Sequence, residues 1–299
     1  MSNKPLVSVI VNCFNGEKYL EECLNSIINQ TYQNWELIFW DNHSTDNSKK
    51  IFEKFEDKRL KYYLSSKHTF LYEARDQAVK MSKGEFLAFC DVDDFWSKEK
   101  LECLIPLFLD KKVGIAYSNV WLLNNTNKKK RKYINNELPK GNLKFHIIKH
   151  SPVTILAAVI RKSEYYNLKT GFNKNYQIIG DFDFFVRISK NIKFDCIQKP
   201  LVFYRLHDEN FTKKNRDIEV KELEVWFEEM KNVDSFFSKE ELDLINEKIL
   251  YRKIMILILK KNLFSSIIKI LKFPNNIKKI KLFVALLLPN FILRRIKEF

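Results

Sequence analysis

The residues best suited to chemistry are three carboxylates in one short segment, Asp91, Asp93 and Asp94. They follow an apolar run, Phe86–Phe89, of the kind that forms a buried strand. Crowded carboxylates raise one another's pKa values unless a cation or hydrogen-bond donors lie beside them. Mg²⁺ and Mn²⁺ prefer oxygen ligands and often combine one or two carboxylates with substrate phosphates. The cluster therefore indicates either a metal–diphosphate site or an acidic loop that caps a helix starting near Ser97.

Hydrophobic periodicity predicts the elements that position this cluster. Strands are expected at Leu6–Val11, Glu36–Trp40, Leu60–Leu64, Glu85–Cys90, Gly114–Leu122, Val153–Ile160 and Phe194–Leu206, and helices at Tyr19–Ile28, Asp46–Phe55, Leu71–Met81, Lys98–Leu109, Asp181–Ser189 and across 215–260. Strands that alternate with helices of this length predict right-handed β-α-β units. The expected fold class is α/β, with a mostly parallel central sheet flanked by helices.

Polar residues follow three of these strands. Asn12 to Asn15 come after the first strand, Asp41 after the second and Asp91 after the fourth. Ligands of such sheets bind beyond the carboxyl ends of the strands. We therefore expect these three segments to converge on one binding site.

Cysteine usage indicates a reducing environment. The chain has five scattered cysteines and no CxxC pair, and Cys13, Cys23 and Cys90 fall in apolar segments where they are expected to be core residues. The first apolar run, Leu6–Val11, is too short for the hydrophobic part of a signal peptide. A cytoplasmic location is therefore expected.

The net charge of +15 is spread unevenly. Residues 251–299 hold 12 Lys/Arg and one acidic residue, whereas residues 1–250 hold 40 basic and 36 acidic residues. A second basic run, Lys128–Lys132, lies in a polar stretch and is expected to be a solvated loop, with contact to anionic lipid or substrate as the alternative.

Residues 251–299 alternate aliphatic clusters, such as Ile254–Leu259 and Ile267–Phe273, with Lys and Arg. The longest uncharged run, Leu282–Leu293, is too short to span a bilayer. This pattern favours an amphipathic segment lying in the plane of an anionic membrane surface. Nucleic acid is not the expected partner, because aromatic residues are few and aliphatic residues many. The alternative is that these helices pack on the rest of the chain or form a dimer contact.

Four motifs, in order and at matching spacing, resemble glycosyltransferase family 2, the nucleotide-sugar transferases with a GT-A fold. They are Val7–Asn15 with Gln30–Tyr32, Trp40–Asp46, Ala74–Asp76 with Gly84–Asp94, and Gly180–Asp183 with Tyr204–His207. The resemblance covers roughly residues 5–210. It implies a catalytic domain at 1–212, with a nucleotide-sugar half at about 1–122 and an acceptor half at about 123–212. Residues 213–299 would be a helical, basic extension.

The resemblance also implies roles on the nucleotide side. Phe14 and Asn15 would lie beside the nucleotide base, and Asp41 would accept a hydrogen bond from the N–H of a uracil ring. Arg75 would contact the base or a phosphate, and Asp91 would bind ribose hydroxyls or the metal. The alternatives are an Asx-type turn for Asp41 and a surface ion pair for Arg75.

The same resemblance implies a divalent metal, Mn²⁺ or Mg²⁺. Asp93 is the first-choice ligand, with Asp91 as the second and Asp94 as a helper or a helix cap. His207 would complete the metal shell or contact a phosphate, unless it is an ordinary hydrogen-bonded histidine. Trp96 would stack on a sugar ring or pack in the core.

Asp181 matches the family's catalytic base, and Asp183 is its nearby competitor. An inverting transfer needs one carboxylate within hydrogen-bond reach of the acceptor hydroxyl and no covalent intermediate. Asp181 could also cap the helix that follows it. The motifs depart from the family pattern at three places: Gly180 where Glu is frequent, Asn42-His43 in the loop after Asp41, and Asn12-Cys13 where Pro-Thr or Pro-Val is frequent.

The predicted protein is an inverting, metal-dependent glycosyltransferase that uses a nucleotide-sugar, and the resemblance implies a UDP-sugar. The predicted acceptor is a cell-surface glycan such as lipopolysaccharide or a lipid-linked oligosaccharide, at the cytoplasmic face of the inner membrane. One rival is a sugar-phosphate nucleotidyltransferase, which usually has a Gly-rich phosphate loop where this chain has the single Gly16. The other rival is a non-catalytic scaffold that docks on membranes.

Overall fold

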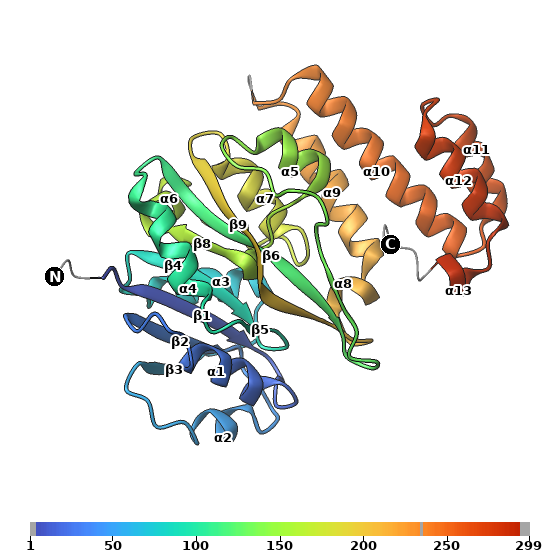
Figure 1. Ribbon diagram of the computed structural model, residues 1–299. Helices are drawn as coiled ribbons and strands as arrows, with labels where there is room; N and C mark the ends of the chain where they lie inside the picture. The colour runs from blue at the N-terminus through green and yellow to red at the C-terminus, as the bar shows by residue number, and fades with distance from the viewer. Residues whose placement is uncertain (1–3, 234–235, 294–299) are drawn as a thin grey trace. The chain divides into compact units, whose positions relative to one another are not determined.

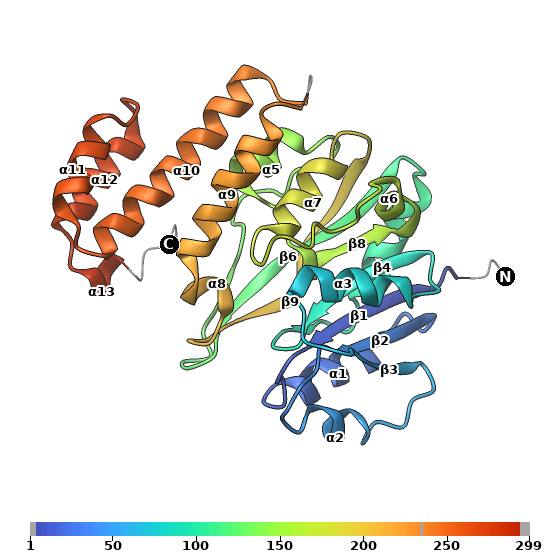
Figure 2. The ribbon, with the colours of Figure 1, turned by 180° about the vertical axis from the view of Figure 1, so that it is seen from behind.

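The computed structural model describes residues 4–233 and 236–293. The chain divides into two compact units, Met1–Asn210 and Phe211–Phe299, close to the boundary expected after residue 212. Figures 1 and 2 show the first unit as a sheet with helices and the second as helices.

The first part of unit 1 alternates strands and helices as the periodicity predicts. Its elements are β1 Val7–Cys13, α1 Leu20–Ile28, β2 Trp35–Asp41, α2 Ser48–Phe52, β3 Leu60–Leu64, α3 Leu71–Lys80 and β4 Phe86–Asp91. The strands β1, β2, β3 and β4 pair in parallel. Their residues are almost all apolar and buried in β1, β2 and β4, as expected of strands covered on both faces.

The rest of unit 1 completes the sheet. Its elements are β5 Phe95–Trp96, α4 Lys100–Leu104, η1 Ile105–Leu109, β6 Val113–Asn124, β7 Lys130–Lys132, α5 Lys144–His150, η2 Ile155–Ala157, β8 Ala158–Arg161, α6 Lys162–Asn167, α7 Gly180–Ile188 and β9 Lys193–Leu206. The strand order is β3-β2-β1-β4-β8-β6-β9-β5, with β7 beside β6. Strand β8 runs antiparallel to both β4 and β6, and β9 runs parallel to β6. The α/β prediction is confirmed, with a mixed sheet whose parallel part is the N-terminal half.

The register brings the predicted strand ends level. Asn12 lies opposite Asp91 across β1 and β4, and Cys13 lies opposite Asp41 across β1 and β2. The three polar segments therefore meet at one edge of the sheet, as expected.

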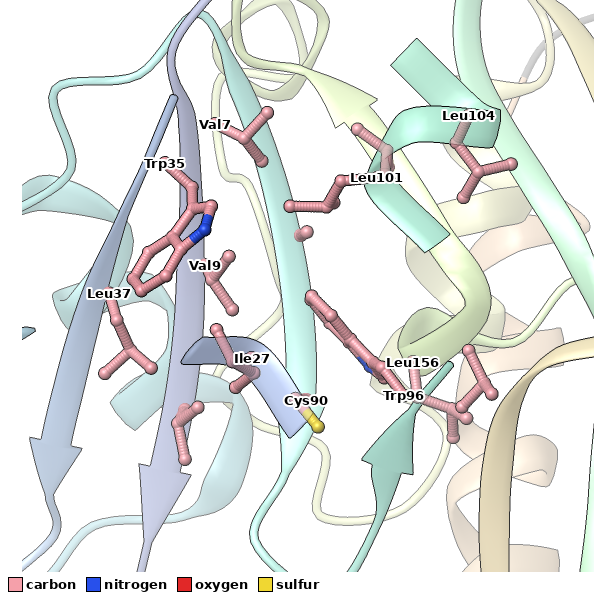
Figure 3. Packing of buried hydrophobic residues seen from close by; sticks show 14 of the residues in the cluster. Val7, Val9, Ile27, Trp35, Leu37, Cys90, Trp96, Leu101, Leu104 and Leu156 are labelled. Atoms are coloured by element: carbon pink, nitrogen blue, oxygen red, sulfur yellow. The ribbon is translucent and has the colours of Figure 1, made fainter. Parts of the chain in front are cut away.

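The main core lies between this sheet and the helices α1 and α4, which stand in front of the sheet in Figure 1, whereas α3 covers the other face in Figure 2. Cys13, Cys23 and Cys90 are buried in this core, as predicted. Trp96 is only 3% exposed and lies among the buried side chains around Cys90 and Leu156 (Figure 3). Trp96 is therefore a core residue, which leaves no face for a sugar ring.

The buried side chain of Lys100 also contacts Trp96 and helps to hold it in the core. Lys100 Nζ lies 3.4 Å from the centroid of the Trp96 ring and donates a hydrogen bond of 2.8 Å to the carbonyl oxygen of Leu156. Burial holds the pKa of Lys100 well below its ordinary value. The helix predicted to start near Ser97 begins at Lys100 instead, with no side-chain cap at its start.

Three other local predictions need correction. The predicted helix Lys98–Leu109 changes to a 3₁₀ helix at Ile105, where Pro106 removes a backbone donor. The predicted strand Val153–Ile160 is shorter, because residues 155–157 form a 3₁₀ turn before β8. The basic run Lys128–Lys132 is not entirely loop, since Lys130–Lys132 pairs with β6 as strand β7.

Unit 2 is helical. It contains α8 Phe211–Lys214, α9 Arg216–Met230, α10 Lys239–Leu259, α11 Leu263–Leu271, α12 Ile277–Leu287 and α13 Asn290–Leu293. Buried apolar side chains from α10 to α13 form a core of their own: Ile254, Met255, Ile258, Ile270, Phe273, Leu282, Ala285 and Leu293. Within residues 4–233 and 236–293, no helix has the length and apolar character needed to cross a bilayer. The predicted basic tail ends in residues 294–299, which lie outside the described residues.

Candidate active site

The loops after β1 and β2 are tied to each other. Asn15 adopts a φ of 52°, a left-handed conformation that Asn tolerates. Its side-chain oxygen accepts a hydrogen bond of 2.8 Å from the backbone N–H of Thr45, and its own N–H donates to Ser44 Oγ. Phe14 is 47% exposed, and its ring lies 4.0 Å from that of His68. These hydrogen bonds tie the two loops together, and the loops present the Phe14 ring to solvent.

Asp41 is buried at the end of β2. Its Oδ1 accepts a hydrogen bond of 2.7 Å from the backbone N–H of Ser44, which is the Asx-type turn that was the alternative reading. Its Oδ2 accepts a hydrogen bond of 2.6 Å from the Tyr62 hydroxyl. A carboxylate oxygen has two lone pairs, so each oxygen retains an acceptor position. The turn and a contact with a nucleotide base are therefore compatible.

Arg75 is buried on α3 and pairs with Asp91 at the end of β4. Its guanidinium also lies over the Tyr72 ring, 5.4 Å from the centroid. Burial alone would lower the pKa of Arg75, but the charge and hydrogen bond of Asp91, together with the charge of Asp181, outweigh it and raise the pKa. The alternative of a surface ion pair for Arg75 is therefore wrong. This arginine is a buried charge that neutralises the strand-end carboxylate.

Asp93 and His207 lie side by side although 114 residues separate them in the chain. Asp93 Oδ2 is 2.9 Å from His207 Nε2, and the Asn210 amide lies 3.5 Å from the same oxygen. Burial raises the pKa of Asp93, and so does Asp91, whereas the contact with His207 lowers it. A carboxylate and an imidazole are thus held together beside a second carboxylate.

Asp94 has a different environment from its neighbours. It is 1% exposed, and its Oδ1 accepts a hydrogen bond of 2.8 Å from the backbone N–H of Arg205. Its Oδ2 has no hydrogen-bond partner among the described residues. Burial, then the charges of Asp93 and Asp91, raise the pKa of Asp94 well above its ordinary value. Asp94 therefore joins β4 to β9, and it does not cap a helix.

The donor set at this corner suits a metal that is shared with a substrate. The described part of the chain contains no group of three or more His, Cys, Asp or Glu residues that could hold a metal by themselves. Asp93 and His207 instead offer two adjacent ligand atoms. Mg²⁺ and Mn²⁺ sites with one or two protein ligands are completed by phosphates and water. Asp91 is the weaker candidate ligand, because Arg75 already occupies its Oδ1.

Asp181 stands in the first turn of α7 and is not its N-cap, which is Ile179. Its Oδ1 accepts a hydrogen bond of 2.8 Å from the backbone N–H of Phe182. The Tyr72 hydroxyl lies 3.3 Å from the same oxygen and 2.8 Å from the Ile178 carbonyl oxygen, and its single hydrogen is shared between these two acceptors. Burial raises the pKa of Asp181, and the charge of Arg75 opposes that rise. No described residue donates a hydrogen bond to Asp181 Oδ2. A carboxylate with a raised pKa and such an oxygen is suited to accept a proton.

Gly180 allows this arrangement. A Cβ atom at Gly180 would lie 2.5 Å from the Tyr72 ring, closer than real contacts permit. The departure from the family pattern at Gly180 therefore has a physical reason, since the bulky Tyr72 occupies the space that a larger side chain would need.

Asp183, the competitor for the base role, has another partner. Its Oδ2 accepts hydrogen bonds from Arg187 Nε at 2.9 Å and Nη2 at 2.7 Å. The Asp183 side chain is 3% exposed. This i,i+4 pair holds the start of α7 together and favours Asp181 as the group that faces a substrate.

The structure thus brings the predicted residues into three adjacent groups: Phe14, Asn15 and Asp41; Arg75, Asp91 and Asp181; and Asp93 and His207. Sequence reasoning missed Tyr72, Arg205 and Asn210. Tyr72 and Arg75 are three residues apart on one helix, so their shared face was a usable signal. Arg205 and Asn210 flank His207 but gave no periodic or charge pattern that set them apart.

The chain matches the family model "Glycosyl transferase family 2" over residues 8–185. A glucosyltransferase of Escherichia coli, the UDP-Glc:alpha-D-GlcNAc-diphosphoundecaprenol beta-1,3-glucosyltransferase WfgD, is 36% identical over 120 residues, which cover 40% of this chain and 47% of that protein. The putative teichuronic acid biosynthesis glycosyltransferase TuaG of Bacillus subtilis is 31% identical over 122 residues, covering 40% of this chain and 48% of the relative. The match therefore spans about half the length of these relatives.

Solved structures agree with the fold. TarS of S. aureus in complex with UDP-GlcNAc gives a TM-score of 0.62 at 21% identity, covering 82% of this chain and 72% of that one. The mannosyltransferase PcManGT of Pyrobaculum calidifontis, in complex with GDP-Man and Mn²⁺, gives 0.65 at 15% identity, covering 99% and 82%. These likenesses show a GT-A-like fold. The family model matches more than half of this chain, and the chain therefore belongs to glycosyl transferase family 2.

Proposed function

We propose that the protein is an inverting, metal-dependent glycosyltransferase that transfers a sugar from a UDP-sugar to a hydroxyl of a cell-surface or lipid-linked glycan. The observation that carries the proposal is the grouping of Asp181, Arg75 and Asp91 beside the Asp93–His207 pair. A base, a buried cation and a carboxylate–imidazole pair are the groups that this reaction needs at a single site.

Asp181 acts as the general base in this proposal. Its free oxygen position takes the proton of the acceptor hydroxyl as the oxygen attacks the anomeric carbon. The bond between that carbon and the diphosphate oxygen breaks on the opposite side, so the configuration inverts without a covalent enzyme intermediate. The Phe182 N–H holds the other oxygen in place, and the Tyr72 hydroxyl lies 3.3 Å from it. Such positioning is what general-base catalysis requires.

Asp93 and His207 are the residues that would hold Mn²⁺ or Mg²⁺, together with the donor's diphosphate. When bound, the metal neutralises charge that develops on the departing nucleoside diphosphate. Asp91 remains open to ribose hydroxyls through the oxygen that Arg75 does not occupy. Arg75 neutralises Asp91 and thereby limits the repulsion that the diphosphate would meet.

Phe14, Asn15 and Asp41 would receive the nucleotide base. The exposed Phe14 ring offers a stacking surface, and Asp41 offers acceptor positions for the N–H of uracil. The relative WfgD uses UDP-Glc by its name, and TarS was solved with UDP-GlcNAc, which supports a uridine donor. A lipid-linked acceptor is supported by the diphosphoundecaprenol substrate named for WfgD. Such an acceptor would place the enzyme at the cytoplasmic face of the inner membrane.

A donor screen tests the proposal. The purified full chain is titrated by calorimetry with UDP-, GDP-, dTDP- and CMP-sugars, with Mn²⁺ present or removed by a chelator. We expect one UDP-sugar to bind in a Mn²⁺-dependent manner and to be hydrolysed slowly to UDP. NMR of the first sugar product is expected to show an inverted anomeric configuration. A chain that binds no donor would support the scaffold alternative, and a retained configuration would exclude the Asp181 mechanism.

A further inference from the structure

Helix α11 exposes a continuous apolar face. Five residues on one side of this helix are exposed: Leu263, Phe264, Ile267, Ile268 and Leu271. Their spacing of one, three or four residues places them along one stripe of an α-helix. Ser266 and Ile270 lie on the opposite side and are buried. The stripe is therefore the solvent side of a helix whose other side is already packed.

Helix α12 repeats this arrangement. Its exposed apolar residues are Ile277, Ile280, Phe283, Val284 and Leu287, whereas Leu282 and Ala285 are buried in the core of unit 2. Figure 1 shows α11 and α12 side by side next to α10. The ten exposed residues of the two helices are called the α11–α12 face below. Apolar exposure on this scale marks an interaction surface.

The charged residues of α11 and α12 are all basic. The sequence contains no acidic residue between Glu247 and Glu298. Lys278 of α12 pairs with Glu247 of α10, but Lys269 and Lys272 make no ion pair with any residue that the structure describes. The Lys279 ammonium donates to the Leu271 carbonyl oxygen at 2.8 Å. The α11–α12 face is thus accompanied by two lysines, Lys269 and Lys272, whose charge no described residue balances.

The cations of α10 differ, because acidic residues of α9 balance them. Arg252 pairs with Glu219, Lys253 with Glu224, and Lys260 with Asp217. The aliphatic residues of α10 that made the tail look membrane-prone are also accounted for, since Ile254 and Ile258 lie in the core of unit 2. These three cations and two isoleucines are therefore already engaged within unit 2.

We propose that the α11–α12 face docks on an anionic lipid bilayer, with both helices in the plane of the membrane. Ten exposed apolar side chains would enter the acyl boundary while lysines contact lipid phosphates. A second copy of the chain is the less favourable occupant, because self-association would bring lysines against lysines. The proposal goes beyond transferase activity and narrows the expected membrane segment from 251–299 to these two helices.

Vesicle sedimentation of the full chain tests the docking surface. The vesicles contain phosphatidylcholine alone or phosphatidylcholine and phosphatidylglycerol in equal parts. Wild-type protein is expected to sediment with the mixed vesicles and to be released by high salt, since salt screens lysine–phosphate attraction. The double substitution Phe264→Gln and Ile280→Gln is expected to weaken binding by at least about tenfold. Lys269→Gln with Lys272→Gln is expected to weaken it roughly 25-fold, at about 1 kcal/mol for each lysine.

Matched control variants carry the same kinds of substitution at exposed positions outside the α11–α12 face. Val225→Gln removes a side chain that is 53% exposed on α9, and Lys111→Gln with Lys112→Gln removes two exposed cations from unit 1. Both controls are expected to bind like the wild type, and circular dichroism of every variant checks folding. Equal binding of the Phe264/Ile280 variant and the wild type would overturn the proposal. The proposal would also be overturned if light scattering detected a wild-type dimer that does not bind anionic vesicles and that the Phe264 and Ile280 substitutions dissociate. None of these measurements depends on transferase activity.

Discussion

Two acidic motifs of unit 1 look alike in the sequence but differ in their surroundings. Carboxylates of the β4 motif, Asp91 to Asp94, contact Arg75, His207 and the backbone N–H of Arg205. In the α7 motif, Asp181 lies beside the Tyr72 hydroxyl and Asp183 pairs with Arg187. In each motif one carboxylate has a structural role: Asp94 joins β9 to β4, and Asp183 holds Arg187.

The comparison separates two ways of keeping carboxylates in a site. Around Asp91 and Asp93, cationic or hydrogen-bonding partners offset the repulsion between neighbouring charges. Burial raises the pKa of both Asp93 and Asp181, but Asp93 contacts the His207 imidazole, whereas Asp181 forms no ion pair with any residue that the structure describes. The first arrangement suits stable binding of a cation and phosphates, whereas the second suits a group that must take up a proton.

The largest expected effect is at Asp181. Asp181→Asn removes the proton acceptor and is expected to lower kcat by roughly 10²–10⁴-fold while leaving donor affinity unchanged. Steady-state kinetics and donor calorimetry measure the two quantities. The matched variant Asp183→Asn is expected to keep kcat within about threefold and to lose about 2 kcal/mol of stability, because Arg187 loses a charged hydrogen-bond partner. If Asp183→Asn lowered kcat by this amount and Asp181→Asn did not, Asp183 would be the base and Asp181 the structural residue.

Asp93 should show the next largest effect. Asp93→Asn replaces a carboxylate ligand by a neutral amide, so the affinity for Mn²⁺ in the presence of UDP is expected to fall at least about tenfold. His207→Gln is expected to weaken Mn²⁺ binding in the same assay. His146→Gln, at an exposed position of α5, serves as the histidine control and should leave binding unchanged. Unaltered Mn²⁺ affinity in Asp93→Asn would exclude Asp93 as a ligand.

The pH dependence offers a finer test. Transfer requires a deprotonated Asp181, so the rate falls as the pH drops through the pKa of this group. Arg75 lowers that pKa and Asp91 raises it. Arg75→Met is therefore expected to move the acidic limb of the kcat profile to higher pH, and Asp91→Asn to move it to lower pH. Shifts of the same sign in both variants would contradict the assignment of this limb to Asp181.

The smallest effect is expected at Asp94. Burial already raises the pKa of Asp94, so the amide of Asp94→Asn should substitute well for the carboxyl group and change kcat by less than about threefold. Asp94→Ala leaves the Arg205 N–H without its acceptor and is expected to cost about 1–3 kcal/mol of stability. Thermal unfolding and kinetics measure both variants. A large loss of kcat in a stably folded Asp94→Asn would assign this carboxylate to the metal instead.

Much of unit 1 was predictable from local patterns. Apolar runs placed β1, β2, β3 and β4 within a residue or two of their observed bounds. In β1, β2 and β4 the reason is that strands buried on both faces are nearly continuous apolar segments. Their alternation with helices then predicted that Asn12, Asp41 and Asp91 would meet at one edge, which the register confirms. The motifs that resemble family 2 predicted the family itself, and the family match confirms it.

Partners that lie far apart in the chain were not predictable in this way. Asp94 and Arg205 are 111 residues apart, and Asp93 and His207 are 114 apart, so no local spacing relates them. Trp96 could not be assigned to core or surface before its neighbours were known. Its burial beside Lys100 follows from the packing of α4 against the sheet.

The sequence by itself determined the kinds of groups that the protein has and the order of its strands and helices, because both follow from residue type and short-range periodicity. Only the tertiary structure decided which carboxylates are paired with a cation, which ones have a raised pKa, and which tail residues are core. Apolar residues of α10 and α11 follow similar patterns in the sequence, yet Ile254 is fully buried and Phe264 is 79% exposed. Burial and charge pairing depend on neighbours from distant segments, and folding alone brings those neighbours together.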